Sequence, residues 1–554
     1  MNRRGAGAVA SALLLALLAW LVLYPLVLVL AEGVRGPAGW TLEHVREFLG
    51  RPTEMRALWN SLWISLASVA LAALLGVPLA FLLGRYDLPG GRVLGGLVAL
   101  PAVLPPLVGV VAFLFLYGET GFVPLLLMWL LRLEEPPWRL EGAGAILLVH
   151  AYSMYVYFYL LVRAALVSLD ASQLEAAASL GAGRWRSFRL VVLPHLAPAL
   201  AGATLLTFMT SLGSFSAPYV FGGGFRVMPT QIVATRLNGE NQLAMIETAS
   251  LAAMALLALL LFRGGSRGSA GGRKGAGPTR IVIGGRLARA GAGLVGWALA
   301  ALLLLPHLTL VLVSFVPVGT WTTEPLPPAY TVHNYIALVE DPVRLRPLVN
   351  SIWLATVATL AAVGIALAGA LLNARRLTPA RRAIEGLLAL PWAVPGTVFA
   401  IALATAFSVH APAVGRFVLV GTLWILPLAY LVRNLPITSR AITAGVRALD
   451  PSLDEAAASL GAKRLRTLRR VTLPLLRPAL LAGASLAFVT AFGDFVTSIM
   501  LYTYDTRPIS LEILSSLRQA YVGVAAAYGV VLMLVSAMVF ALGSGGPGRG
   551  GTAG

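Results

Sequence analysis

Two nearly identical nine-residue segments hold the most distinctive side chains of the sequence. Residues 174–182 read Leu-Glu-Ala-Ala-Ala-Ser-Leu-Gly-Ala, and residues 454–462 read Asp-Glu-Ala-Ala-Ala-Ser-Leu-Gly-Ala. Glutamate and alanine favour a short helix, and the glycines Gly181 and Gly461 let the chain change direction where that helix ends. A short helix with a small apolar face and a carboxylate is suited to binding in a groove of a soluble partner.

A carboxylate inside an apolar run is the second candidate for chemistry. Asp494 lies within the run 476–501, and a charge at that depth in lipid is costly unless it is paired or hydrated. Ser214 occupies the matching place in an earlier run. The alternatives are a helix-end position for Asp494 and ordinary packing at the neighbouring glycines. Two matching sets are predicted to line a translocation path: Gly213, Ser214 and Phe215, and Gly493, Asp494 and Phe495.

Other reactive groups are sparse. The chain has no cysteine, which excludes disulfides, thiolate metal sites and cysteine nucleophiles. His150 and His195 stand alone, so no histidine cluster predicts a metal site. No His-Glu-x-x-His motif, Ser-His pair or Asp pair occurs within the apolar runs, which disfavours an intramembrane enzyme. Arg163 and Arg433, at the predicted ends of two apolar runs, are interpreted as anchors that reach the membrane surface.

The composition is that of a membrane protein. Of the 554 residues, 58% are hydrophobic and only 12% are charged, whereas soluble domains carry roughly 25% charged residues. The apolar runs are continuous rather than alternating, which favours helices over a barrel. The net charge of +19 would suggest nucleic-acid binding in a soluble protein. Here most of the basic residues lie in short loops between apolar runs, which is typical of cytoplasmic loops.

The apolar runs predict an all-α polytopic membrane protein with about twelve transmembrane helices. The first run is too long for a signal peptide and lacks a clear cleavage site, so we interpret it as a span. The apolar stretch 121–131 is too short to span and is predicted to be re-entrant or interfacial. The predicted spans are 8–31, 57–84, 92–117, 143–168, 196–221 and 243–263, followed by 288–316, 348–373, 383–408, 413–436, 476–501 and 520–543.

Basic residues predict the orientation of the spans. Arg85 and Arg92 flank the loop after the second span, and Arg381 and Arg382 lie in the loop after the eighth. The segment between the halves is basic and rich in glycine. With an even number of spans in each half, these loops share one side, which the positive-inside rule makes the cytoplasm. Both termini are therefore predicted to be cytoplasmic.

The two halves of the chain are copies of one unit. Beyond the nine-residue segments, Leu193-Pro194 matches Leu473-Pro474, and Asn60-Ser61-Leu62-Trp63 matches Asn350-Ser351-Ile352-Trp353. Because each copy has an even number of spans, both enter the membrane from the same side, as two parallel six-helix repeats. The predicted organisation is a first half (1–263), a basic cytoplasmic linker (264–287), a second half (288–543) and a flexible tail (544–554).

The duplicated segments resemble the EAA loops of ABC importer permeases. The likeness rests on a Glu-Ala-Ala start, a glycine six residues after the glutamate and the following Leu-Pro, at the expected place in both halves. It covers nearly the whole chain and implies the type I, MetI-like permease fold. It also implies that each loop docks an ATP-binding subunit. The implied docking residues are Glu175, Ala176, Ala177, Leu180 and Gly181, and Glu455, Ala456, Ala457, Leu460 and Gly461.

The same resemblance implies the partners and the location of the chain. A bacterial cell membrane, two copies of an ATP-binding subunit and an extracytoplasmic substrate-binding protein are expected. The chain lacks the Gly-x-x-x-x-Gly-Lys-Ser/Thr phosphate loop. ATP and Mg²⁺ are therefore expected on the partner subunit, with no cofactor bound by this chain. An amphipathic helix lying on lipid headgroups is the alternative for one loop, but two near-identical copies favour a shared twofold partner.

The cargo is less well defined than the machinery. Two fused halves, with Gly493-Asp494-Phe495 and Ser214-Phe215-Ser216-Ala217-Pro218, look similar to the ferric-iron permeases. Permeases for thiamine, polyamines and phosphonates carry related stretches and remain alternatives. An ion-coupled secondary transporter is the competing class, because such proteins also have parallel six-helix halves. That class predicts coupling groups inside the membrane, for which Asp494 is the one candidate.

Overall fold

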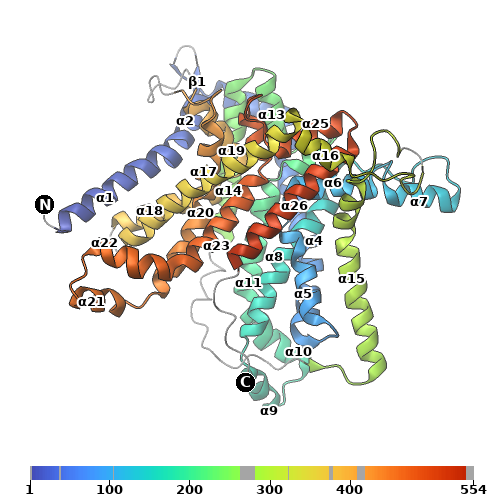
Figure 1. Ribbon diagram of the computed structural model, residues 1–554, viewed down its shortest axis with the longest axis horizontal. Helices are drawn as coiled ribbons and strands as arrows, with labels where there is room; N and C mark the ends of the chain where they lie inside the picture. The colour runs from blue at the N-terminus through green and yellow to red at the C-terminus, as the bar shows by residue number, and fades with distance from the viewer. Residues whose placement is uncertain are drawn as a thin grey trace. The chain divides into compact units, whose positions relative to one another are not determined.

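The described part of the chain is almost entirely helical (Figure 1). A computed structural model describes residues 3–36, 39–103, 105–262, 281–321, 324–373, 379–408 and 418–544. Most of the predicted linker and the last ten residues of the predicted tail lie outside the described residues. These described residues include two short strand pairs: β1 (Arg35–Gly36) pairs antiparallel with β2 (Gly39–Trp40), and β3 (Tyr86–Asp87) pairs parallel with β4 (Ile281–Val282).

The chain folds as two compact units, and each unit combines segments from both halves of the sequence. Unit 1 comprises Met1–Glu47, Thr235–Ala249 and Val332–Gly554, and unit 2 comprises Phe48–Ala234 and Ser250–Thr331. The first helix of the first half therefore belongs to unit 1, and the first helix of the second half belongs to unit 2. The two packing units therefore differ from the two continuous halves that the sequence repeat suggests.

Unit 2 holds most of the first half together with α15. Its helices are α4 (Pro52–Arg85), α5 (Gly91–Ala99), η2 (Leu100–Val103), α6 (Pro106–Tyr117), α7 (Phe122–Leu131), α8 (Gly142–Ser168), α9 (Ala171–Ser179), α10 (Arg184–Ser187), η3 (Phe188–Val192), α11 (Leu193–Leu212), α12 (Ser216–Phe221) and α15 (Arg286–Val313). Three further helices cross the unit boundaries: α3 (Glu43–Gly50), α13 (Met228–Leu237) and α14 (Asn241–Phe262).

Unit 1 joins the N-terminal helix to most of the second half. Its helices are α1 (Arg3–Leu18), η1 (Ala19–Leu23), α2 (Tyr24–Gly33), α16 (His333–Glu340), α17 (Pro342–Asn373), α18 (Pro379–Ala389), η4 (Leu390–Trp392), α19 (Gly396–Ala406), α20 (Ile425–Ala448), α21 (Ser452–Ser459), α22 (Arg464–Thr467), η5 (Leu468–Thr472), α23 (Leu473–Phe492), α24 (Val496–Leu501), α25 (Ile509–Arg518) and α26 (Val522–Ser544). Trp20 packs against Phe407 with ring centroids 5.3 Å apart, which seats the N-terminal helix on α19.

The predicted membrane architecture is confirmed. Among the described residues, ten helices are long and apolar enough to cross a membrane, or eleven if a bent pair counts as one span. That pair, Pro379–Trp392 with Gly396–Ala406, bends by 109° close to Pro391 and Pro395. The predicted third span is likewise broken into α5, η2 and α6 at its prolines, because proline lacks the N–H that continues a helix.

The tenth predicted span is wrong in its position. Residues 413–436 are apolar, but α20 begins at Ile425 and ends at Ala448. Gly421 has a φ of 82°, in the left-handed region that breaks a helix before α20 starts. The shift also places polar residues within the helix, among them Arg433 and Arg440. The helix α20 aligns with α8 in the repeat. Because of its polar residues, α20 is not among the helices that are apolar enough to cross a membrane by composition.

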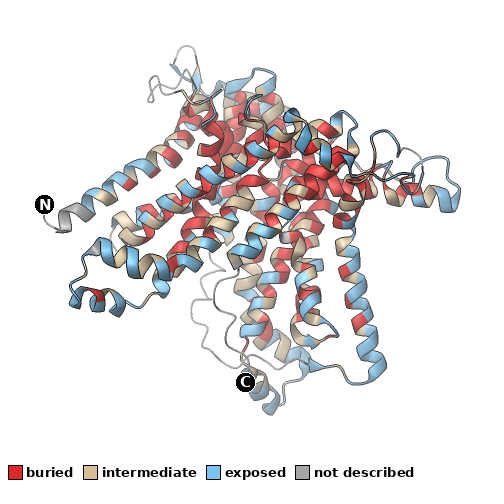
Figure 2. Cartoon of the chain, viewed as in Figure 1, coloured by how far each residue is buried: buried red, intermediate tan, exposed pale blue. Residues whose placement is uncertain are grey.

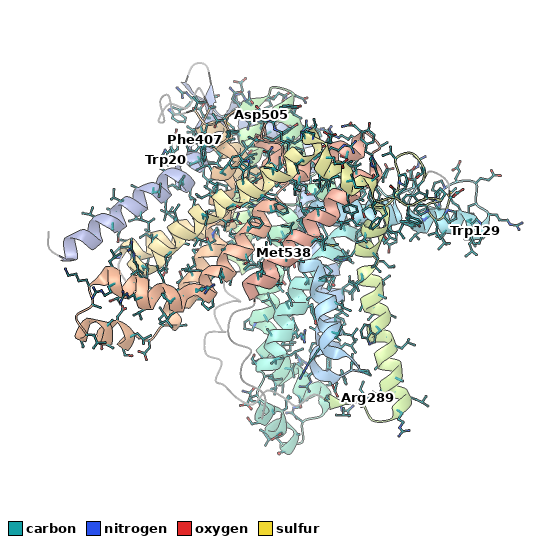
Figure 3. All side chains as sticks on the ribbon, in the orientation of Figure 1. Trp20, Trp129, Arg289, Phe407, Asp505 and Met538 are labelled. Atoms are coloured by element: carbon teal, nitrogen blue, oxygen red, sulfur yellow. The ribbon has the colours of Figure 1, made fainter. Side chains whose placement is uncertain are left out.

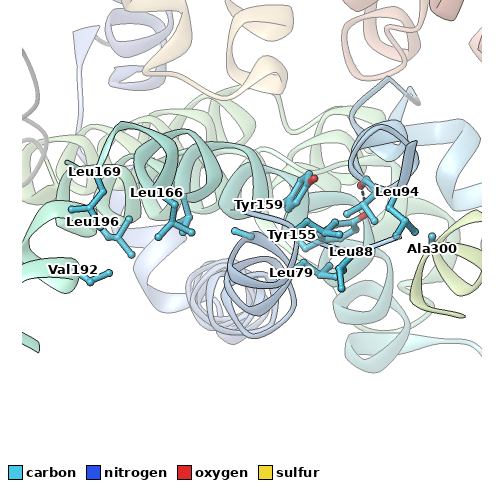
Figure 4. Close-up of a cluster of buried hydrophobic side chains, with 14 residues drawn as sticks. Leu79, Leu88, Leu94, Tyr155, Tyr159, Leu166, Leu169, Val192, Leu196 and Ala300 are labelled. Atoms are coloured by element: carbon cyan, nitrogen blue, oxygen red, sulfur yellow. Dashed lines mark hydrogen bonds between the residues drawn. The ribbon is translucent and has the colours of Figure 1, made fainter. Parts of the chain in front are cut away.

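The core of unit 2 explains why α15 belongs to it. A buried cluster joins α4, α5, α8 and η3, and it includes Tyr155 and Tyr159 of α8 together with Ala300 of α15 (Figure 4). Trp297 of α15 donates its indole N–H to the carbonyl of Pro89 at 3.2 Å. A Cβ at Gly293 would lie 3.2 Å from the Pro89 ring. The small residue thus lets α15 approach the first half closely.

Candidate functional site

The first duplicated loop forms a helix–turn–helix. The Asp170 carboxylate accepts a hydrogen bond from the backbone N–H of Ser172 at 3.0 Å, which caps α9. The helix ends at Leu180, and Gly181 has a φ of 74°, a left-handed conformation that glycine adopts without strain. The base of the loop is anchored because Leu174 packs against the buried cluster of unit 2.

The second loop has the same construction in unit 1. The Asp450 carboxylate accepts the backbone N–H of Ser452 at 2.9 Å. That hydrogen bond stabilises the ionised carboxylate and lowers the pKa of Asp450 below its ordinary value. The helix α21 follows, and Gly461 has a φ of 75°. The predicted turn at both glycines is confirmed by these two angles.

Both loops expose most of the residues that the sequence singled out. Leu180 is 86% exposed and Leu460 is 88% exposed. Glu175, Ala176, Glu455 and Ala456 are exposed as well, whereas Ala177 is half-buried and Ala457 is buried. Figure 2 shows both loop helices largely in the colour of exposed residues. A leucine this exposed at the tip of a turn contributes nothing to the core of its own unit. Two such turns, each beside an exposed glutamate, form surfaces with the character of a partner-binding site.

Two matching helix breaks, one in each unit, are the second candidate feature. The helix α11 ends at Leu212 and α12 begins at Ser216. In the same way, α23 ends at Phe492 and α24 begins at Val496. Phe215 and Phe495 are buried directly after the two breaks. The breaks leave backbone groups without helical partners. Side chains at Ser214 and Asp494 therefore lie where a helix has to restart.

Asp494 is fully engaged by its own unit. Its Oδ1 accepts the backbone N–H groups of Thr497 at 2.8 Å and Ser498 at 3.1 Å, which caps α24. Its Oδ2 accepts a hydrogen bond from Nη1 of Arg433 at 2.5 Å and another from the Thr497 hydroxyl at 3.2 Å. The side chain of Asp494 is only 2% exposed. The carboxylate thus caps α24, in agreement with the helix-end alternative for its position, whereas its pairing with Arg433 was not predicted.

Arg433 corrects an interpretation made from the sequence. It was expected to anchor a cytoplasmic helix end, but it lies in the interior of α20, facing Asp494. The error follows from the misplaced start of α20. A Cβ at Gly396 would lie 2.8 Å from Nη1 of Arg433, so the glycine makes room for the guanidinium between α19 and α20.

His150 is the second polar residue whose role the sequence missed. It is 2% exposed, and its Nδ1 lies 2.9 Å from the Ser68 hydroxyl and 3.1 Å from that of Ser211. Its Nε2 lies 2.8 Å from the Ser214 hydroxyl. The ring thereby joins α4, α8 and α11 at the helix break. When the repeats are aligned on their loop glycines, His150 matches Tyr430, whose hydroxyl bonds Ser498 at 2.6 Å.

We expect the replacement of His150 by alanine to lower the free energy of unfolding by about 2–3 kcal/mol, because buried hydroxyls would lose their partner and a cavity would form. Thermal unfolding of the purified protein in detergent measures the change. Leu148→Ala, at a 41% exposed position on the same helix, is the matched control and is expected to shift the midpoint little. Equal shifts for the two variants would contradict the bridging role of His150.

A match to a protein-family model identifies the family of this chain. The model for the binding-protein-dependent transport system inner membrane component matches twice, at residues 76–264 and 351–544. The chain belongs to this family of ABC importer permeases. Each match contains one of the two loops and one of the two helix breaks. The permease is thus a multi-pass membrane protein and a transport component rather than an enzyme, with two permease domains fused in one chain.

Curated relatives extend over most of the permease. A probable ABC transporter permease protein, y4fN of Sinorhizobium fredii, is 31% identical and covers 89% of this chain and 88% of its own length. The ferric transport system permease protein FbpB of Actinobacillus pleuropneumoniae is 29% identical over 96% of this chain and 76% of its own. The molybdenum transport system permease protein ModB of Escherichia coli strain K12 is 34% identical over 37% of this chain and 91% of its own.

Proposed function

We propose that this permease carries a substrate from an extracytoplasmic binding protein into the cytoplasm, with each of its two loops docking one separate ATP-binding subunit. The observation that supports the proposal is the pair of exposed, capped turns on α9–α10 and α21–α22. Two equal docking sites suit two copies of one partner. The basic residues near the loops and both termini support a cytoplasmic location for them.

ATP is proposed to drive alternating access from outside the chain. ATP and Mg²⁺ would be bound by the partner subunits, because the sequence has no phosphate-binding loop of its own. Closure of the paired subunits would move the two loops, and with them the helices that carry the breaks at Gly213 and Gly493. The residues around these breaks, including Ser214 and Asp494, are proposed to lie along the translocation path.

Ferric iron is the proposed cargo. The support is the relative named for ferric transport, which aligns over both halves of the chain. The relative named for molybdenum transport covers less than half of it, so molybdate is the second candidate. Asp494 does not favour a site for bare iron, because Arg433 and the cap of α24 already occupy its oxygens. Selection of the cargo is therefore assigned chiefly to the binding protein.

Uptake by the reconstituted transporter tests this proposal. We expect radioactive ferric iron to accumulate in proteoliposomes only when ATP, the ATP-binding subunit and the binding protein are all present. Addition of a protonophore is expected to leave the rate unchanged, since no ion gradient drives the process. Accumulation of molybdate instead of iron would reassign the cargo. Uptake that needs an ion gradient but no ATP would identify a secondary transporter and overturn the proposal.

A further inference from the structure

Three arginines lie on one face of α20 in unit 1. Arg433, Arg440 and Arg447 are spaced by seven residues, and this spacing returns to nearly the same face of a helix after two turns. Neighbouring arginines are therefore about 10 Å apart along the helix axis. The matching positions of α8 in the first half hold Ser153, Leu160 and Val167. The arginine face is thus a feature of α20 that its counterpart lacks.

Arg440 is held in the middle of this face by the broken span. Its guanidinium carbon lies 4.3 Å from the centroid of the Trp392 ring, which is a cation–π contact. Trp392 is the last residue of η4, thirteen residues after α18 begins at Pro379, or about 20 Å along a helix. The contact therefore keeps the guanidinium beside the bend of the broken span.

The helix after that bend is fixed at one end and shaped for a cation at the other. Phe407 directly follows α19, and its ring packs edge to face on Trp20 (Figure 3). At the start of α19, a Cβ at Gly396 would lie 2.8 Å from Nη1 of Arg433. The break between η4 and α19 thus makes room for Arg433 on one side and holds Arg440 on the other.

Negative charge around α20 is too sparse to neutralise this face. The elements that pack against α20 are α17, α18, η4, α19, α23 and α24. In these elements and the turn between α23 and α24, the only acidic side chains are Glu385 and Asp494. Asp494 pairs with Arg433, and Glu385 is shared by Arg447 and a second arginine. Arg440 is exposed and has no ion pair in the described part of the chain, so its positive charge is uncompensated.

We propose that the arginine face of α20 binds an anionic cargo during translocation: a free oxyanion, or ferric iron in a negatively charged complex with oxyanions. The inference rests on the proposed function, because Arg433 faces Asp494, one of the residues proposed to lie along the path. An arginine within a membrane span faces the interior of the bundle or water rather than lipid. Its planar fork of N–H donors fits the oxygens of a phosphate or a carboxylate.

Two of the arginines keep donors for such a cargo. Both hydrogen bonds of the Arg433 guanidinium start at Nη1, towards Asp494 and Thr497, and the side chain is 33% exposed. Arg440 contacts Trp392 through the flat face of its guanidinium, which leaves the N–H edge available. Several weak sites in a row suit passage better than one tight site, because a carrier has to release its cargo.

The test is ATP-dependent uptake by proteoliposomes that hold the permease and its ATP-binding subunit, with the binding protein outside. The probes are radioactive molybdate, and radioactive ferric iron supplied with radioactive phosphate. We expect Arg440→Gln to lower accumulation of the transported anion by about tenfold or more, because a charge-assisted contact is lost. Arg440→Lys keeps the charge and is expected to retain most of the uptake. Arg382→Gln, at an exposed position on α18, is the matched control and is expected to have no effect.

The two probes separate the two sources of the anion. Molybdate uptake that depends on Arg440 would identify a free oxyanion as the cargo. Iron and phosphate that accumulate in a fixed ratio, and are both lost in Arg440→Gln, would identify an anionic iron complex. Either result supports the inference.

The remaining outcomes overturn the inference in distinguishable ways. Uptake at the wild-type rate in Arg440→Gln, or iron that enters without phosphate, would refute the anion site and leave the proposed function intact. Lost uptake that Arg440→Lys does not restore, together with a lower unfolding temperature, would show that Arg440 only packs α20 against η4. A wild type that accumulates neither probe in the presence of ATP would overturn the proposed function, and this inference with it.

Discussion

Reversing the charge of Glu175 and Glu455 together is expected to abolish both co-purification of the ATP-binding subunit and substrate uptake. Both glutamates are exposed on short helices, so the substitutions leave the packing of either unit unchanged. A cation in place of the carboxylate would oppose any groove that is complementary to it, and unfavourable charge contacts at an interface cost several kcal/mol. Affinity purification of the tagged permease, followed by quantification of the bound ATPase, measures the effect.

The control for the Glu175/Glu455 variant makes the same glutamate-to-arginine substitutions on a different loop. Glu134→Arg with Glu135→Arg changes two exposed acidic residues in a segment predicted to face outward, and this variant is expected to retain the ATPase. Thermal unfolding of both double variants establishes that the permease is still folded. If the Glu175/Glu455 variant kept its ATPase and continued to transport, the docking hypothesis would be wrong.

The sequence was sufficient for features that depend on local pattern. Runs of apolar residues located most spans within a few residues of α4, α8, α14, α15 and α26, because length and hydrophobicity alone decide whether a helix suits the bilayer. The loop helices and their turns at Gly181 and Gly461 were likewise predictable, since a Glu-Ala run and a glycine determine the conformation of neighbouring residues.

Features that depend on distant contacts were not predictable in the same way. Arg433 and Asp494 are 61 residues apart in the chain, and no periodicity connects them. His150 looked isolated because its partners Ser68, Ser211 and Ser214 lie on other helices. The exchange of first helices between the packing units depends on contacts such as Trp297 with Pro89. Each pairing joins residues that are far apart in the chain, and local sequence patterns do not reveal such pairings.

Removing one partner of the Arg433–Asp494 pair is expected to destabilise the permease strongly. Arg433→Ser leaves a carboxylate that is 2% exposed without its cation, and such unpaired buried charges cost about 3–5 kcal/mol. Because the Arg433 side chain is 33% exposed, water can reach the site and we expect about 3 kcal/mol, at the lower end of that range. Thermal unfolding in detergent, monitored by tryptophan fluorescence, measures the loss.

The first half indicates which second substitution should restore the stability that is lost in Arg433→Ser. There, Ser153 and Ser214 occupy the positions that match Arg433 and Asp494, so the repeat tolerates an uncharged pair at this helix break. The double variant Arg433→Ser with Asp494→Ser keeps a hydroxyl to cap α24 and leaves no buried charge. We therefore expect it to be more stable than Arg433→Ser alone, with a coupling of about 1–3 kcal/mol in the double-mutant cycle. Additive losses would mean that Asp494 serves only as the helix cap and that its pairing with Arg433 contributes no stability.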